Sequence, residues 1–353
     1  MPACLHETVI AMNLCYMRSP ALTALLLFTI AAGLSGCRPK GSEGMVPGAA
    51  PGNTGISRAD AFSLAIDQVL ASSNSDDPFL RANAIEAAHG LHDRCRQLVH
   101  LGLEDPHDAV RFVAVATAGK FRLKSVVPML SRLPNEPSPS VRAAALFALQ
   151  RCDQPVDLSP LADMIRQPDA SLRGNVAMLL GQLADPSAVP MLKDIAKLGS
   201  DPQITALEHS IVQIQIAEAL VKLGDESGRD VIRAAAFSQH QEVRILAVQM
   251  LGRLNDKKYG PALVAMLSKD PVELRLAAAE ALARLGDDRG LEQVVEGSRF
   301  ELPVVRAQAA LALASFRSAR AAGVCVRMLR DPSEQVRLAA AAAIIQAAGP
   351  PKQ

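Results

Sequence analysis

Arginine recurs at near-constant intervals along most of the chain, and this spacing is the first pattern that suggests chemistry. Only one step is much longer than the others, the step from Arg173 to Arg244. The eight arginines, called the arginine row below, are Arg81, Arg111, Arg142, Arg173, Arg244, Arg275, Arg306 and Arg337. A guanidinium group presents a planar fork of donors that binds a carboxylate or phosphate through two parallel hydrogen bonds. The row therefore predicts either a structural series of ion pairs or a strip that binds anions.

Each arginine of the row lies about one turn inside a segment with the apolar spacing of a helix. One such segment reads DPVELRLAAAEALARLGD, from Asp270 onward. Asp270 can cap this helix, and Pro271 fits the first helical position. Gly286 allows the left-handed turn that ends it. We call the helix that carries the arginine helix A.

A second, shorter helix B is expected after each turn. Asp287 or Asp288 can cap it, and in this copy it should span residues 291–297. The turn aspartates are Asp185, Asp225, Asp256 and Asp287. We expect each row arginine to bind the turn aspartate of its own or the preceding copy, because a half-buried arginine is usually paired. This structural pairing is favoured over an anion-binding strip.

The single long step contains a degenerate copy in which Gln213 replaces arginine. The step from Gln213 to Arg244 has the usual length, so the excess precedes Gln213. It amounts to nine residues, which fall within Lys197–Ser210. The pair Asp201-Pro202 offers a helix start well ahead of Gln213, so we expect most of the insertion to lengthen helix A by about two turns. A tolerated surface extension is favoured over a binding element.

Nine copies with a period of about 31 residues predict an all-α fold, an α-solenoid of two-helix repeats. The pattern resembles HEAT-like repeats, in particular the short repeats of phycobilisome lyases, over residues 77–348. The residues that carry this resemblance are Asp77-Pro78, Asp105-Pro106, Asp270-Pro271, Asp331-Pro332, Gly224-Asp225, Gly286-Asp287 and the Val/Leu-Arg pairs. Departures are Asn135-Glu136-Pro137, Gln167-Pro168, Arg151-Cys152-Asp153 and Gln213. The resemblance implies helices displayed along a curved surface, with members that range from chromophore lyases to scaffolds.

Composition is consistent with this fold and argues against nucleic acid as a partner. Apolar residues make up 49% of the chain, aromatic residues only 3%, and tryptophan is absent from the sequence. The formal net charge of +1 provides no global field for the phosphates of nucleic acid or membranes. Charged residues expected on the concave face through helices B have mixed signs: Arg132, Lys193, Lys197, Arg233, Glu296 and Arg327.

Histidine and cysteine crowd the first copy, where a metal site is the alternative to a solvated turn. The side chains are His89, His92, Cys95, His100 and His107. HGLHDRC contains ligand types that bind zinc or copper, but the segment spans a helix end, so the ligands need not converge. We expect no metal site and no cofactor. The sequence also lacks a Ser/His/Asp arrangement or a phosphate-binding glycine loop, so we expect no catalytic residues.

Six cysteines occur in the sequence. Cys95, Cys152 and Cys325 fall in the first, third and eighth copies, too far apart in a solenoid to form disulfides with one another. We therefore expect three buried or unbridged thiols. Cys4 and Cys15 belong to a segment that we expect to be removed.

The N-terminal segment reads as a targeting signal. Arg18 supplies the positive charge, and the apolar stretch 21–32 is too short to span a membrane. The lipobox residues are Leu34, Ser35, Gly36 and Cys37. They resemble the lipobox of bacterial lipoprotein precursors, which implies that residues 1–36 are cleaved as a signal peptide and that Cys37 is lipidated.

Two features refine this interpretation. Glu7 is atypical of a signal peptide, so we expect translation to start at Met17. Arg38 follows the cysteine in place of aspartate, and by the same resemblance this favours the outer membrane. Residues 37–55 should form a lipidated, flexible Pro/Gly-rich tether, residues 56–76 an N-terminal capping helix around 56–70, and residues 77–349 the solenoid.

These expectations favour a lipid-anchored scaffold without enzymatic activity. It would bind a protein or peptide partner at the bacterial cell envelope, facing the periplasm, and contact the membrane through the lipid on Cys37. The alternative is a lyase-type enzyme or an accessory enzyme subunit that uses the concave face of the solenoid.

Overall fold

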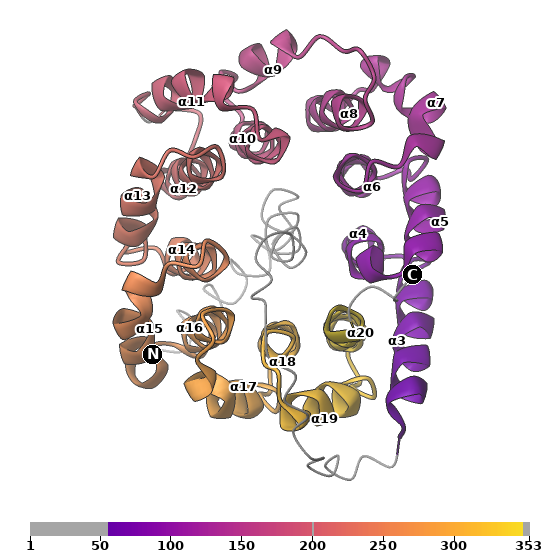
Figure 1. Ribbon diagram of the computed structural model, residues 1–353, viewed down its shortest axis with the longest axis vertical. Coiled ribbons are helices and arrows are strands. Elements are labelled where there is room, and N and C mark those ends of the chain that lie inside the picture. The colour runs from indigo at the N-terminus through magenta and orange to yellow at the C-terminus, as the bar shows by residue number, and fades with distance from the viewer. Residues whose placement is uncertain (1–55, 200, 349–353) are drawn as a thin grey trace, which may run out of the picture. The chain divides into compact units, whose positions relative to one another are not determined.

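The structure is a computed structural model that describes residues 56–199 and 201–348. Every regular element in these residues is a helix, and no strand occurs among them. From α6 onward, longer and shorter helices alternate along the sequence as helix A and helix B (Figure 1). The predicted all-α, two-helix repeat is therefore confirmed. None of the helices in this part of the chain is long and apolar enough to cross a bilayer.

The described residues form two compact units. The first comprises residues 76–86 and 96–243, and the second comprises residues 56–75, 87–95 and 244–348. Helices α5 (His92–Gly102) and α14 (Gln241–Arg253) each contribute residues to both units.

In the first unit the helices A form one layer and the helices B the other (Figure 1). Helices A are α4 (Pro78–Ala87), α6 (Asp108–Lys120), α8 (Pro139–Arg151), α10 (Ala170–Leu183) and α12 (Ala206–Lys222). Helices B are α5, α7 (Val127–Leu130), α9 (Ser159–Met164), α11 (Val189–Ala196) and α13 (Ser227–Ala235). Successive helices A pack side by side from α6 to α12.

The second unit repeats this arrangement and adds the first described helix. Helices A are α16 (Val272–Arg284), α18 (Pro303–Leu313) and α20 (Glu334–Ala348), together with most of α14. Helices B are α15 (Gly260–Lys269), α17 (Leu291–Gly297) and α19 (Ala319–Met328). Helix α3 (Arg58–Ser72) packs against α20, whose other flank contacts α18 (Figure 1). This helix, expected as an N-terminal cap, packs on the last copy.

Each row arginine is the fourth residue of its helix A, which confirms the predicted position one turn inside the helix. The backbone positions with positive φ at the ends of these helices recur with the same period. They are Arg122, Asp153, Ala184, Gly224, Asn255 and Gly286. The step from Ala184 to Gly224 contains the same nine-residue insertion as the arginine row. The left-handed turn predicted at Gly286 is confirmed, with φ of 88°.

Neighbouring helices A approach closely where one of them carries glycine. A Cβ added to Gly119 of α6 would lie 2.7 Å from the Ala148 Cα of α8. A Cβ on Gly252 of α14 would lie 2.6 Å from the Ala281 Cα of α16. These contacts involve backbone atoms, so a larger residue at either glycine would push the helices apart.

The insertion lengthens helix A less than expected. Helix α12 begins at Ala206, and it has 17 residues where α14 and α16 have 13, which is about one extra turn. The Thr205 hydroxyl accepts a hydrogen bond from the Glu208 N–H, and the Glu208 carboxylate accepts one from the Thr205 N–H. This capping box fixes the start of α12. The residues from 197 to 205 that the structure describes lie in turns and irregular backbone, so the expected two-turn extension is wrong.

Two further expectations need correction. In each unit the helices A lie on the concave side and the helices B on the convex side, opposite to the expected placement of the helix B charges (Figure 1).

Helix α16 begins at Val272 with Pro271 as its N-cap residue, so Asp270 is not the cap. Pro78, in contrast, is the first residue of α4, as an Asp-Pro start predicts. Helix B of the seventh copy has the expected bounds, and Asp287 caps the short 3₁₀ turn that leads into it.

Candidate functional site: the arginine clamps

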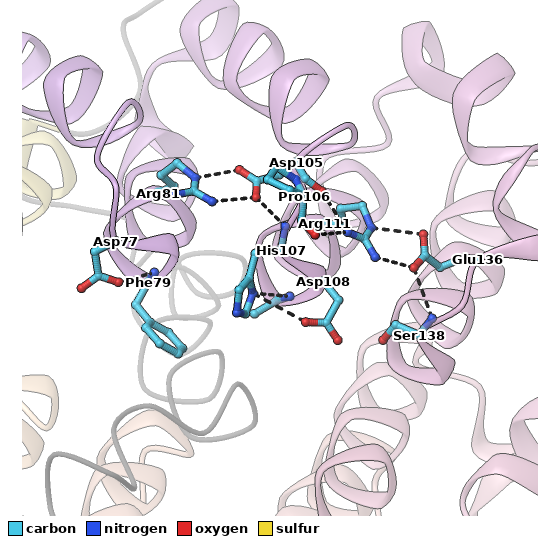
Figure 2. A network of polar contacts seen from close by, with 11 residues as sticks. Asp77, Phe79, Arg81, Asp105, Pro106, His107, Asp108, Arg111, Glu136 and Ser138 are labelled. Atoms are coloured by element: carbon cyan, nitrogen blue, oxygen red, sulfur yellow. Dashed lines mark hydrogen bonds and ion pairs between the residues drawn. The ribbon is translucent and has the colours of Figure 1, made fainter.

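The arginine of the first copy binds the acidic residue that opens the second copy. Arg81 Nε donates to Asp105 Oδ2 at 2.7 Å, and Arg81 Nη2 donates to Asp105 Oδ1 at 2.8 Å (Figure 2). The third nitrogen, Nη1, donates to the Asp76 carbonyl oxygen at 3.1 Å. The guanidinium thus bridges the loop before its own helix and the loop before the next helix A. We call this set of bonds an arginine clamp.

The clamp repeats in the second copy and is continuous with the first. Arg111 Nη2 and Nε donate to Glu136 Oε1 and Oε2 at 2.6 and 3.1 Å. Arg111 Nη1 donates to the carbonyl oxygens of Asp105 and Pro106 at 2.9 and 3.0 Å. Asp105 therefore receives one arginine on its side chain and the next on its backbone (Figure 2).

The carboxylate of each clamp also binds the backbone just ahead of the next helix. Asp105 Oδ1 accepts a hydrogen bond from the His107 N–H at 2.9 Å, and Glu136 Oε1 accepts one from the Ser138 N–H at 3.2 Å. These side chains are 10% and 7% exposed, so the ion pairs are largely shielded from solvent. Each carboxylate thereby fixes both the helix start and the contact between copies.

In the second unit the same geometry joins the last two copies. Arg306 Nε and Nη2 donate to Asp331 Oδ2 and Oδ1 at 2.8 and 2.9 Å. Arg337 Nη1 then donates to the Asp331 carbonyl oxygen at 2.9 Å. Arg337 Nε donates to the side-chain oxygen of Gln68 on α3 at 3.0 Å. Helix α3 therefore supplies the acceptor that a following copy supplies elsewhere.

The clamp also persists across the insertion, with a longer sequence spacing. Arg173 Nη2 lies 3.5 Å from Asp201 Oδ2, and Arg173 Nε donates to the Gln167 carbonyl oxygen at 2.6 Å. In the regular clamps the acceptor follows its arginine by 24 or 25 residues, and Asp201 lies slightly further along the chain from Arg173. Asp201 therefore does not start helix α12 but serves as the clamp acceptor.

The expected partners of the row arginines were wrong. Turn aspartates bind the backbone or side chains of their own loops: Asp185 accepts from the Ser187 N–H, Asp225 from the Ser227 N–H, and Asp287 from Arg289. Asp225 also pairs with Lys193 of α11 in the preceding copy. Asp256 is buried. The arginine partners belong to the following copy, and they occupy the Asp-Pro or Glu-Pro pairs. The recurrence of an acidic residue 24 or 25 residues after arginine was the sequence signal for these acceptors.

Not every row arginine has a carboxylate acceptor. Arg142 donates through Nη1 to the carbonyl oxygens of Glu136 and Pro137 at 2.6 and 2.9 Å. For Arg244 and Arg275, the Nε atom is buried, and no residue of the described chain accepts a hydrogen bond from it. In some copies the row arginine thus forms a structural ion pair, and in others it lacks the carboxylate acceptor.

The Arg81–Asp105 and Arg306–Asp331 clamps raise the pKa of the arginine and lower that of the aspartate. Burial raises the pKa of Asp105, but hydrogen bonds from Arg81 and the His107 N–H outweigh it and leave the pKa below its usual value. Burial likewise raises the pKa of Asp331, the hydrogen bond from Arg306 lowers it, and the net pKa is again below its usual value. At the Asp225 turn, hydrogen bonds from Lys193 and Ser227 lower the carboxyl pKa to about 2. Near neutral pH the carboxylates of Asp105, Asp225 and Asp331 are therefore charged.

The histidine-rich segment of the first copy forms separate local contacts. His107 Nδ1 accepts a hydrogen bond from the Ala109 N–H at 3.2 Å and so caps α6, and its ring lies edge-on to Phe79. Within residues 56–199 and 201–348, no three His, Cys, Asp or Glu side chains converge as metal ligands. Cys95, Cys152 and Cys325 are buried thiols, as the spacing predicts. Burial raises the pKa of Cys325 to about 12.

The signal peptide, the lipobox Leu34-Ser35-Gly36-Cys37 and the tether lie outside the described residues. Their roles remain predictions from the sequence.

Comparison with known proteins identifies the repeat. The family profile described as HEAT repeats matches residues 66–150, 128–210, 202–283 and 260–346, which together span most of the chain. A deoxyhypusine hydroxylase from Phaeosphaeria nodorum is 34% identical over 94 residues, which are 25% of this chain and 26% of that protein. The chain thus spans about a quarter of the length of this curated relative.

Three solved structures are similar at low sequence identity and low TM-score. The complex of CpcE and CpcF of phycocyanin lyase from Nostoc is 20% identical, with a TM-score of 0.39 over 63% of this chain and 88% of that one. Human deoxyhypusine hydroxylase in complex with glycerol is 16% identical, with a TM-score of 0.35 over 81% and 98% of the two chains. Kap121p bound to Nup53p is 13% identical, with a TM-score of 0.34 over 78% and 36%.

Proposed function

Because the chain belongs to the HEAT-repeat family, we propose that it is a lipid-anchored scaffold that binds a protein or peptide partner at the bacterial cell envelope. The role is non-enzymatic and needs no cofactor or nucleic acid. The arginine clamps are the observation that carries this proposal. They tie the loop before one helix A to the loop before the next, as in Arg81 with Asp105 and Arg306 with Asp331.

Clamped copies favour binding because they fix the relative positions of successive helices before a partner arrives. A preorganised surface loses less conformational entropy on association, so more of the contact energy appears as affinity. The close approach of α6 to α8 at Gly119 also restricts the movement of these two helices relative to each other. Stacked repeats of this length offer enough surface for an interface of standard size, about 800 Å² per partner.

The place of action rests on the N-terminal sequence. Lipidation of Cys37 would hold the protein at a membrane, and several acyl chains give a stable anchor where one is marginal. The tether after Cys37 is rich in Pro, Gly and small polar residues, which gives reach to the repeats. Arg38 favours the outer membrane, with the repeats facing the periplasm.

Two experiments separate the anchor from the binding role. Cells grown with an alkyne fatty acid should yield a labelled protein that fractionates with membranes, and Cys37→Ser should lose both label and membrane association. Crosslinking in intact cells, followed by mass spectrometry, should recover the same partner with the wild-type protein in independent preparations. A wild-type protein that crosslinks to no specific partner would contradict the scaffold function, and a labelled Cys37→Ser variant would contradict the anchor.

A further inference from the structure

The repeated clamp provides an internal reference for what surrounds a row arginine. In three clamps the Nε atom donates to a carboxylate oxygen of the following copy: 2.7 Å for Arg81, 3.1 Å for Arg111 and 2.8 Å for Arg306. The side chains of these arginines are 13–17% exposed. In these three clamps the carboxylate therefore occupies the same position relative to its arginine.

Arg275 occupies the same helical position but lacks this carboxylate. Phe300 stands where the acceptor should be, at the same separation from Arg275 as Asp331 has from Arg306. Arg275 Nε is buried, and within the described chain it has no hydrogen-bond acceptor. The equivalent atom of Arg244, in the preceding copy of the same unit, is in the same condition. For Arg244 the residue at this separation is Lys269, followed by Asp270, and the Arg244 Nε has no acceptor in the described residues.

A buried donor without an acceptor is destabilising, and a charged one more so. Both arginines are half-buried as whole residues, although their Nε atoms are buried. Two adjacent guanidinium groups thus present the donor fork that elsewhere in this chain holds a carboxylate. External carboxylates complete the same geometry when the side chains that cover the two Nε atoms move aside.

We propose that Arg244 and Arg275 bind two carboxylates of an acidic segment in the partner protein. This inference rests on the proposed scaffold function and assigns the surface that the partner uses. Neighbouring helices lie about 8–10 Å apart, and an extended chain rises about 3.3 Å per residue. The two acidic residues are therefore about three positions apart in an extended segment. Binding weakens as salt rises, because exposed charges are screened.

The direct test follows the Nε–Hε signals of ¹⁵N-arginine-labelled protein by NMR. The probe is the peptide acetyl-Gly-Glu-Gly-Gly-Glu-Gly-amide, and its Gln counterpart is the matched control. The Glu peptide should shift the signals of Arg244 and Arg275 and leave that of Arg306, which is occupied by Asp331, in place. The assignment is overturned by equal shifts at Arg306, by equal binding of the Gln peptide, or by inorganic phosphate that binds as tightly as the Glu peptide.

Two kinds of variant test the site from opposite directions. Arg275→Gln should weaken binding of the Glu peptide about tenfold, since one charge-assisted contact is lost. Phe300→Asp places a carboxylate where Asp331 stands relative to Arg306. This substitution should raise the melting temperature and weaken binding of the Glu peptide by a similar factor. Tight peptide binding by the folded Phe300→Asp variant would overturn the proposal, even where Arg275→Gln fails to fold.

Failure of this inference is distinguishable from failure of the scaffold function. A double variant, Arg244→Gln with Arg275→Gln, should crosslink to the partner in cells at least tenfold less than wild type. Undiminished crosslinking would overturn the acidic-segment site and leave the scaffold function intact. The peptide titration with purified protein does not depend on the cellular partner, so it tests the site separately.

Discussion

Gln68 and Arg337 are 269 residues apart in the chain, and the Arg337 Nε donates a 3.0 Å hydrogen bond to the Gln68 side-chain oxygen. A second hydrogen bond also joins α3 to α20, from the Ser72 hydroxyl to Glu334 Oε1 at 2.9 Å. The first described helix is thereby fixed to the last one.

This contact predicts that a lesion in α3 loosens the C-terminal end. Ala65 of α3 is fully buried, and a charge there would cost about 3 kcal/mol or more. Ala65→Glu should therefore increase hydrogen exchange in α20. Leu64→Glu is the matched control, because Leu64 is 43% exposed on the same helix. Unchanged protection of α20 in Ala65→Glu would contradict the packing of α3 on α20.

The clamps predict unequal costs along the arginine row. Arg306→Gln leaves the Asp331 carboxylate, 11% exposed, without its partner and should lower the free energy of unfolding by about 2 kcal/mol. Arg275→Gln removes no such pair and should cost clearly less. Urea denaturation followed by circular dichroism measures both. Arg320→Gln is the exposed control, since Arg320 and Glu292 are 55% and 66% exposed and their pair adds little. Equal losses for Arg306→Gln and Arg275→Gln would refute the distinction.

The lowered pKa values of Asp105 and Asp331 predict acid sensitivity. Because each folded-state pKa lies below its unfolded value, the clamps add stability above the unfolded pKa of about 3.9, and this is lost as pH falls toward the folded pKa. The free energy of unfolding should therefore fall below about pH 4. Measured from pH 3 to 6, Asp105→Asn and Asp331→Asn should each show a shallower fall than wild type. A fall of unchanged slope in both variants would exclude the clamps as its source.

Burial of Cys325 predicts a thiol that is inert in the folded protein. Its pKa of about 12 leaves almost no thiolate at pH 8, and thiolate is the reactive form. Iodoacetamide should modify Cys325 in urea but not in native buffer, as peptide mapping by mass spectrometry would show. Cys152 is also buried with a raised pKa and should behave alike. Fast native labelling of either residue would contradict the described packing.

Helix contacts predict opposite outcomes for two glycine substitutions. Gly119→Ala forces a Cβ to within 2.7 Å of the Ala148 backbone and should destabilise the protein by about 2 kcal/mol. Gly260→Ala meets nothing within 4 Å and should be neutral or slightly stabilising. Thermal melts of the two variants provide the comparison. A harmless Gly119→Ala would show that α6 and α8 are further apart than described.

Sequence reasoning located the helices better than the contacts between them. The arginine period placed Arg275 and its equivalents correctly, because one residue per repeat marks the same helical position. It missed Asp105 and Glu136 as acceptors, since spacing along the chain does not say which neighbouring loop a long side chain reaches. The expected helix start was Asp201-Pro202, whereas the capping box of Thr205 and Glu208 fixes the start of α12.

The position of α3 lay beyond what periodicity can indicate. A single amphipathic helix with Ala61, Ala65 and Val69 on its buried face fits either end of a repeat array. Only tertiary contacts, such as Gln68 with Arg337, choose between them.

The contact of α3 with α20 also restricts how the repeat number can change in evolution. A duplicated copy added after α20 would have to displace α3 from the surface that it covers. A copy gained or lost between α6 and α12 leaves that surface untouched, provided that arginine and its acceptor are duplicated in step. Changes in length should therefore accumulate in the interior of the array, where the nine-residue insertion already lies.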